Sequence, residues 1–243
     1  MRAARRSSRR ASYGRHRKRR LVYAPGVNPT KLDHVAYWVA DRDPIADFAT
    51  TELGMHVIDR TDAFTLIGSD ARRGKLTLFA AEGPRERGAL KHVALRVSRL
   101  DGGERWFDLA EGVRVGLVEA PTDVEYDLDH VALYSAHPEA AVAEYVSLGF
   151  EAASPGPSGA PRVEVGGAWV EFHPGEPGSP ERPLLNHIAV LVDSAEEHIA
   201  EANDLGVEID DVVDGPNTYA VFLRGPENVR IEYVEHKPTF SLH

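Results

Sequence analysis

Four segments of the chain repeat one pattern, a short apolar run with a histidine near its start. The histidines are His34, His92, His130 and His187, in phrases such as Asp-His-Val-Ala and Asn-His-Ile-Ala. Short apolar runs of this kind are typical of buried strands. A single histidine at the start of a strand is usually structural, so any chemistry has to be argued from the repeat as a whole.

Two of the four repeats also end in a strand that carries an acid between apolar residues. Glu171 stands in Trp-Val-Glu-Phe and Glu232 in Arg-Ile-Glu-Tyr, at nearly equal distances from their own histidines. A carboxylate on an apolar strand is costly to bury unless it is paired or bound to a metal. Imidazole and carboxylate together suit Fe(II), Mn, Ni, Co or Zn. The sequence therefore predicts a divalent-metal site at His130, His187 and Glu232, with Glu171 as a further acid.

The first two repeats have the histidine but lack the acid. The matching position is Leu78 in the first repeat and Gly116 in the second. We therefore expect the active site in the C-terminal half of the chain. The N-terminal half, with His34 and His92, is predicted to hold a degenerate copy.

The segments between the histidine strands predict a β-α-β-β-β order in each repeat, and hence an α+β fold of four such units. Each predicted helix ends at or near a glycine, which accepts the left-handed conformation that closes a helix. These helices are predicted at Pro44–Leu53, Gly103–Ala110, Pro138–Leu148 and Ser194–Leu205. The second unit is short, because only Val113–Val118 clearly follows its helix.

The charge of the chain is divided unevenly. The net charge is −10, yet residues 1–20 hold ten of the 28 basic residues and none of the 38 acidic ones. Residues 1–29 are predicted to be a basic, disordered leader. The acidic remainder is a poor surface for nucleic acid, because phosphates need a basic face. The chain contains no run of 18 apolar residues, so the sequence predicts no membrane span. It also contains no cysteine. We expect a cytoplasmic protein.

The repeated strands, the Leu-Gly turns and the closing phrase Gly-Pro-Glu-Asn-Val-Arg-Ile-Glu-Tyr resemble the vicinal oxygen chelate superfamily. That superfamily contains the glyoxalases, the bleomycin-resistance proteins and the type I extradiol dioxygenases, and the resemblance spans roughly residues 30–236. It implies two domains, each a pair of βαβββ units whose mixed sheet curves into a cup. By this resemblance residues 30–124 form the N-terminal pair and residues 125–243 form the C-terminal pair.

The resemblance to the two-domain dioxygenase branch implies a reaction as well. In that branch the N-terminal pair is empty, and carried over to this chain the ligands are His130, His187 and Glu232. They imply an Fe(II) site with open positions for O2 and a catechol-like aromatic, whose ring would be cleaved. The branch usually has a tyrosine ten residues before the metal glutamate. Phe222 stands there, so nearby Tyr219 is the predicted acid–base residue.

Two alternatives stay open at this point. The glyoxalase I and epimerase branch binds its metal through two His and two Glu, and His130, Glu171, His187 and Glu232 match all four positions. In that branch the glutamate also moves protons, so Glu171 would be catalytic in a metal-dependent isomerase or lyase. The third reading is a resistance-type module that sequesters a ligand. A small-molecule substrate is expected in each case, and a homo-oligomer remains open.

Overall fold

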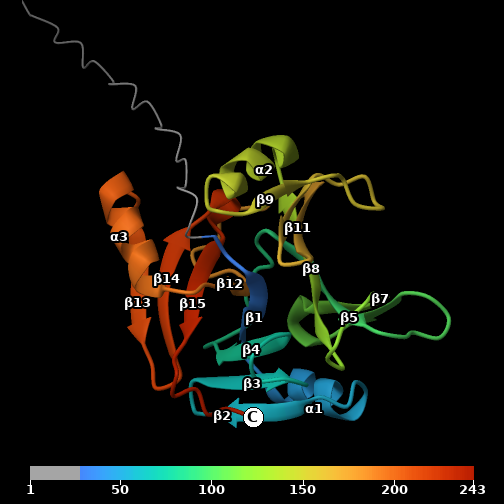
Figure 1. Ribbon diagram of the computed structural model, residues 1–243. Coiled ribbons are helices and arrows are strands. Elements are labelled where there is room, and N and C mark those ends of the chain that lie inside the picture. The colour runs from blue at the N-terminus through green and yellow to red at the C-terminus, as the bar shows by residue number, and fades with distance from the viewer. Residues whose placement is uncertain (1–27) are drawn as a thin grey trace, which may run out of the picture.

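The computed structural model describes residues 28–243, which form two curved β-sheets with three short α-helices packed against them (Figure 1). This arrangement confirms the predicted α+β class built from repeated units. The predicted leader at residues 1–29 lies almost wholly outside the described residues.

The first sheet joins the first and the fourth unit of the chain. Its strand order is β13-β14-β15-β12-β1-β4-β3-β2. The strands are β1 (Lys31–Val39), β2 (His56–Arg60), β3 (Phe64–Gly68), β4 (Lys75–Ala80), β12 (Leu185–Leu191), β13 (Ile209–Asp214), β14 (Thr218–Arg224) and β15 (Arg230–His236). The helices α1 (Asp43–Thr51) and α3 (Ala195–Leu205) belong to these units, and a short 3-10 turn, η2 (Pro226–Asn228), precedes β15.

The second sheet joins the second and the third unit. Its order is β6-β7-β5-β8-β11-β10-β9. The strands are β5 (Leu90–Val97), β6 (Arg105–Asp108), β7 (Arg114–Glu119), β8 (Asp127–Ser135), β9 (Glu151–Ala153), β10 (Arg162–Val165) and β11 (Ala168–Pro174), with helix α2 (Pro138–Val146) in the third unit. The helix predicted at Gly103–Ala110 is wrong. Strand β6 and the 3-10 turn η1 (Ala110–Gly112) stand there, because β6 pairs with β7 along the sheet edge.

The units therefore pair across the chain, and the expected pairing of first with second and third with fourth is wrong. The centre of the first sheet is the antiparallel pair β1 and β12, and the centre of the second is the antiparallel pair β5 and β8. Both junctions are made by the histidine strands that open each unit. Because those four strands share one apolar pattern, the sequence does not distinguish between the two ways of pairing them.

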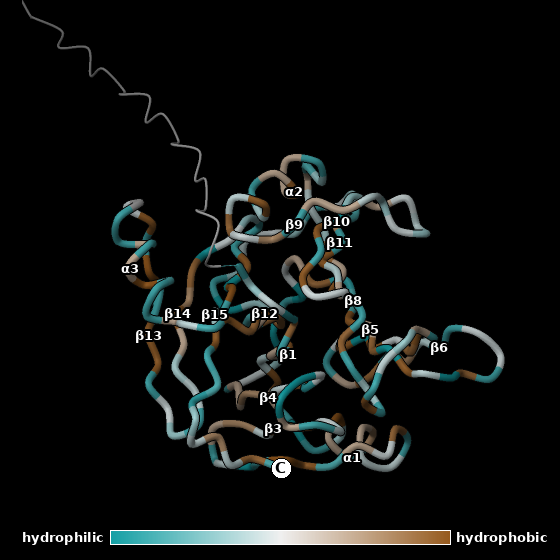
Figure 2. The backbone as a smooth tube through the Cα atoms, viewed as in Figure 1, coloured by the Kyte–Doolittle hydropathy of each residue, from teal (hydrophilic) through white to brown (hydrophobic). Residues whose placement is uncertain are grey.

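One buried hydrophobic cluster draws on both sheets. It includes Val35 of β1, Ile188 of β12, Val93 of β5 and Val131 of β8, and the apolar residues concentrate along the strands (Figure 2). Successive side chains of a strand point to opposite faces. The residues next to these valines and isoleucines, the repeated histidines, therefore lie on the face turned away from this core.

Candidate metal centre

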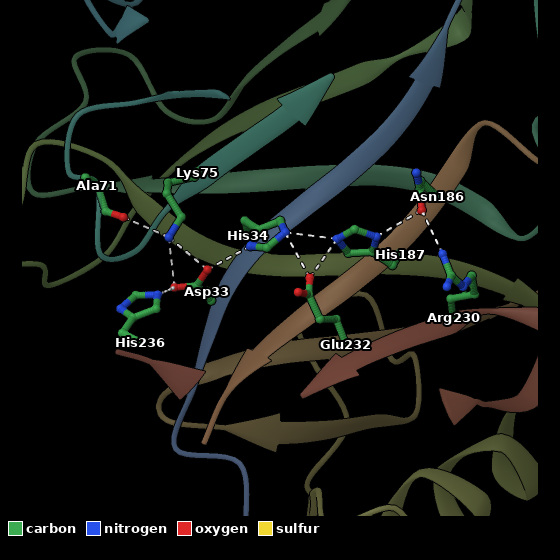
Figure 3. A network of polar contacts seen from close by, with 9 residues as sticks. All are labelled: Asp33, His34, Ala71, Lys75, Asn186, His187, Arg230, Glu232 and His236. Atoms are coloured by element: carbon green, nitrogen blue, oxygen red, sulfur yellow. Dashed lines mark hydrogen bonds and ion pairs between the residues drawn. The ribbon is translucent and has the colours of Figure 1, made fainter. Parts of the chain in front are cut away.

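Three side chains on three neighbouring strands meet in the first sheet. His34 comes from β1, His187 from β12 and Glu232 from β15 (Figure 3). The two imidazole Nε2 atoms lie 2.9 Å apart, and Glu232 Oε2 lies 3.2 Å from His34 Nε2 and 2.9 Å from His187 Nε2. Within residues 28–243 this is the group of histidines and acids whose ligand atoms all lie within 4.8 Å of one another.

The residue before each histidine fixes the tautomer of its ring. His34 Nδ1–H donates to Asp33 Oδ2 at 2.7 Å, and His187 Nδ1–H donates to Asn186 Oδ1 at 2.9 Å (Figure 3). The Nε2 atoms of both rings therefore face the same point beside an acid, and they are the ring atoms that a metal would bind. Outer hydrogen bonds of this kind orient metal-binding histidines in proteins. The donor set fits a divalent cation of the Fe(II), Mn, Co, Ni or Zn type.

The charges of the three side chains favour a proton shared within the triad. Burial alone would lower the pKa of His34, but Glu232 and Asp33 outweigh it and raise the pKa to about 9. Burial would raise the pKa of Glu232, yet His187 and His34 hold it well below its usual range. Burial lowers the pKa of His187, against the pull of Glu232. One proton on His34 thus occupies the place between the ligands that a metal would take.

Metal affinity is therefore expected to depend on pH. A metal has to displace the His34 proton, which is held by a pKa of about 9. Release of one proton makes the apparent affinity rise about tenfold per pH unit below that pKa. Co(II) titrations between pH 7 and 9 should therefore show a rise of about 50-fold, with the slope flattening as pH approaches 9. Affinity that stays constant over this window would contradict the protonation of His34.

Asp33 is held in turn by a buried cluster that the sequence did not indicate. Its carboxylate accepts from Lys75 Nζ at 2.8 and 3.0 Å and lies 3.0 Å from His236 Nε2, and Lys75 Nζ also donates to Ala71 O at 2.9 Å (Figure 3). Burial would raise the pKa of Asp33, but Lys75, His236 and His34 keep it well below its usual value. A lysine inside the apolar strand β4 was the available signal, since β1 and β4 pair with His34 opposite Lys75.

The fourth corner of the site carries a hydroxyl. In the third unit His130 pairs with Trp169 and Glu171 comes two residues later, and Glu232 has the same relation to His187 in the fourth. In the first unit His34 pairs with Lys75, so the equivalent residue is Thr77. The alignment that placed Leu78 there is one residue off, and Leu78 lies in the core. Thr77 is 5% exposed, and its Oγ1 has no hydrogen-bond partner among residues 28–243.

A family model for the glyoxalase/bleomycin resistance protein/dioxygenase superfamily matches residues 31–128 and again residues 127–233. The chain belongs to this superfamily. Many of its members are metalloenzymes, and the triad of the first sheet is consistent with a divalent metal here. A comparison with curated proteins gave no match.

Solved structures share the superfamily fold with this chain. A proposed dioxygenase from Bacillus subtilis superposes with a TM-score of 0.68 at 16% identity, over 88% of this chain and 87% of that one. Glyoxalase I from Zea mays superposes with a TM-score of 0.65 at 14% identity, over 84% of this chain and 92% of that one. The cppA protein from Streptococcus pneumoniae superposes with a TM-score of 0.55 at 13% identity, over 86% of this chain and 100% of that one. At these identities the likeness shows the fold.

In this member of the superfamily the expectation that His130 completes the ligand set is wrong. His130 lies on β8 of the second sheet, where its Nε2 is 3.1 Å from His92 Nε2. Glu171 lies on β11 of the same sheet, with its carboxylate 3.4 Å from His173 Nε2. The first unit shares a sheet with the fourth, so His34 takes the place expected for His130. The half predicted to be degenerate supplies one member of the triad, His34.

The predicted acid–base residue Tyr219 is also not at the triad. Its side chain packs against the hydrophobic core. Phe222, three residues along β14, is on the other face, where its ring lies 5.2 Å from that of His187. Because strand residues alternate between faces, Tyr219 and Phe222, an odd number of residues apart, point to opposite sides of β14, and the observed register turns Phe222 toward the triad.

Two further features border the triad. A cavity of about 320 Å³ lies next to Asn186 and is lined in part by Trp38, Arg224 and Arg230. At the other end of the strands the ring of Phe240 stacks on His236, 4.5 Å away. Within the described chain no helix is long and apolar enough to cross a membrane.

Proposed function

We propose that this chain is a metal-dependent dioxygenase that cleaves the ring of a catechol-like aromatic, with Fe(II) held by His34, His187 and Glu232. The observation that carries the proposal is the ligand set of two histidines and one acid, with Thr77 at the fourth corner. Such a set leaves positions open for a substrate and O2, as in Fe(II) oxygenases. When bound, Fe(II) would supply the Lewis acidity and redox chemistry that join the two reactants.

The side chains around the triad support an aromatic substrate. The rings of Phe222 and Phe79 lie 5.2 and 6.1 Å from that of His187, and Trp38 lies 5.4 Å from Phe79. Flat apolar walls of this kind favour a planar ring, because stacked and edge-on aromatic pairs are stabilising. Thr77 is expected to donate its free hydroxyl to an oxygen of that ring, since no protein acceptor competes for it.

The isomerase alternative loses the ligand set on which it rested. It required His130 and Glu171 beside His187 and Glu232, and the first two lie in the other sheet. A four-ligand set also has fewer positions for reactants. The alternative remains as an outcome of the experiment below.

The test is to reconstitute the full chain anaerobically with Fe(II), add catechols with and without ring carboxylates, and then admit air. O2 uptake matched by a yellow ring-opened product is expected for one or more of them. The same protein loaded with Ni or Zn should be inactive. Turnover without O2 on Ni or Zn would overturn the proposal in favour of an isomerase, and ligand binding unaffected by metal removal would favour a sequestering module.

Thr77→Glu should convert the open site into a four-ligand one. A carboxylate at this corner is expected to raise Co(II) affinity at least about tenfold, since it adds an anionic ligand. It should also abolish O2 uptake, because it fills a position the reactants need. Thr77→Val is the matched control and should change metal affinity by no more than about threefold. Full O2 uptake by Thr77→Glu would contradict the assignment of this corner.

A further inference from the structure

The second sheet forms its own cup around a cavity of about 610 Å³. The cavity is lined by His92 and His130, which correspond by position to His34 and His187, and by Glu171, which corresponds to Glu232. The Nε2 atoms of His92 and His130 lie 3.1 Å apart, much as those of His34 and His187 do in the first sheet, whose site is called the first cup below.

A lysine changes the chemistry of the second cup. In three units the residue before the histidine is an acceptor that holds Nδ1–H: Asp33, Asp129 and Asn186. In the second unit that residue is Lys91, and no acceptor among residues 28–243 reaches Nδ1 of His92. His130 Nδ1–H donates to Asp129, so its Nε2 is an acceptor, and His92 Nε2–H is free to donate to it. The two rings can therefore satisfy each other by this hydrogen bond.

The acid of the second cup is turned away from the two histidines. Glu171 lies 3.4 Å from His173 Nε2 and 3.6 Å from Arg162 Nη1, longer than well-formed hydrogen bonds. Lys91 Nζ donates to His173 Nδ1 at 3.0 Å, which leaves the His173 proton on Nε2. Nε2 of His173 is buried and has no well-formed hydrogen bond. Lys91, His173 and Arg162 therefore all present donors to the cavity.

The other acids around the cavity are already engaged. Asp129 accepts from His130 at 2.7 Å and pairs with Arg96 at 3.2 Å. Glu119 accepts from the backbone N–H of Leu100 at 2.9 Å. Glu104 completes the acids of the lining and is exposed. Burial is the largest cause that lowers the pKa of His92 to about 3, and the neighbouring cationic groups, His130 and Lys91 first, act in the same direction.

Aromatic rings fill the corner that holds Thr77 in the first cup. The equivalent residue is Gly116, and a Cβ there would come within 2.5 Å of the Trp106 ring. Glycine thus admits Trp106, whose ring lies 4.4 Å from that of His92. Trp169 lines the same cavity beneath the guanidinium of Arg162, 4.4 Å away. The lining combines indole faces with cationic donors.

We propose that the second cup binds a small aromatic carboxylate without a metal, its carboxylate on Lys91, Arg162 and His173 and its ring against the tryptophans. Charge-assisted donors recognise carboxylates strongly, and the indole faces supply area for a planar ring. This site is separate from the triad of the first sheet and does not depend on the reaction proposed there.

The test is a calorimetric titration of the metal-free full chain with benzoate, with benzamide as the uncharged isostere. One equivalent of benzoate is expected to bind, at least about tenfold more tightly than benzamide. Lys91→Met should weaken benzoate at least about tenfold, and Lys91→Arg should restore most of the affinity. Arg182→Met, which removes a cation from the lining of the separate cavity beside Asn186, is the control and should leave benzoate binding unchanged.

Three results would overturn the proposal: no benzoate binding, equal affinity for benzoate and benzamide, or wild-type affinity in Lys91→Met. A Co(II) titration of the same proteins gives a further check. Wild-type protein should bind one equivalent of Co(II), and His92→Ala should also bind one. Two equivalents that fall to one in His92→Ala would show that the second cup is a cation site instead.

Discussion

His34→Ala is expected to lose divalent-metal binding, and His130→Ala is expected to keep it. Removing His34 leaves one imidazole and one carboxylate, and it also removes the lone pair that Asp33 aims at the site. Loss of an outer partner alone costs about 10- to 100-fold in metal affinity, so loss of a ligand should cost at least about 100-fold. Turnover should fall to background with it. Chelator competition and metal analysis of the purified variants measure the effect.

His130→Ala is a closely matched control. His130 opens the third unit in the same Leu-Asp-His-Val-Ala phrase as His34, with an aspartate on its Nδ1 and a histidine beside its Nε2. The two variants therefore remove the same ring from the same local sequence and the same kind of hydrogen-bonded pair, and a general loss of stability should affect them alike. If His130→Ala released the metal while His34→Ala retained it, the site assigned here would be wrong.

The repeat was enough to predict the type of chemistry and two members of the group. His187 and Glu232 belong to one unit, so their strands pair in parallel whichever unit lies beside them. The apolar register around Glu232 was readable because Ile231 and Tyr233 flank it and both face the core. Contacts within a unit were therefore accessible from the sequence.

Contacts between units could not be predicted from the sequence, and the wrong assignment of His130 to the triad follows from this. His34 and His130 stand in nearly identical Leu-Asp-His-Val-Ala phrases, so nothing local shows which of them lies beside His187. Which histidine lies beside His187 is decided by which units share a sheet, and β1 of the first unit pairs with β12 of the fourth. Thr77 was missed for a different reason, because β4 carries apolar residues on both faces and its register is set by β1.

Asp33→Ala should be among the most destabilising single changes in this chain. The Lys75 and Asp33 side chains are 4% and 2% exposed, and they form an ion pair at 2.8 Å. Removing the carboxylate leaves a buried ammonium that keeps Ala71 O as its one hydrogen-bond partner among residues 28–243. Breaking a buried pair from one side typically costs about 3–5 kcal/mol. Urea unfolding of the metal-free protein, compared with wild type, measures the loss.

The double variant Asp33→Ala with Lys75→Met separates stability from function. With neither charge buried, most of the lost stability is expected to return, because an apolar pair of similar volume is often no worse than a buried ion pair. Metal affinity should not return, since His34 still lacks the acceptor that fixes its tautomer, and it should stay about 10- to 100-fold below wild type. If the double variant recovered both, Asp33 would serve only to neutralise Lys75. Recovery of stability alone would show that the buried carboxylate orients His34 toward the metal.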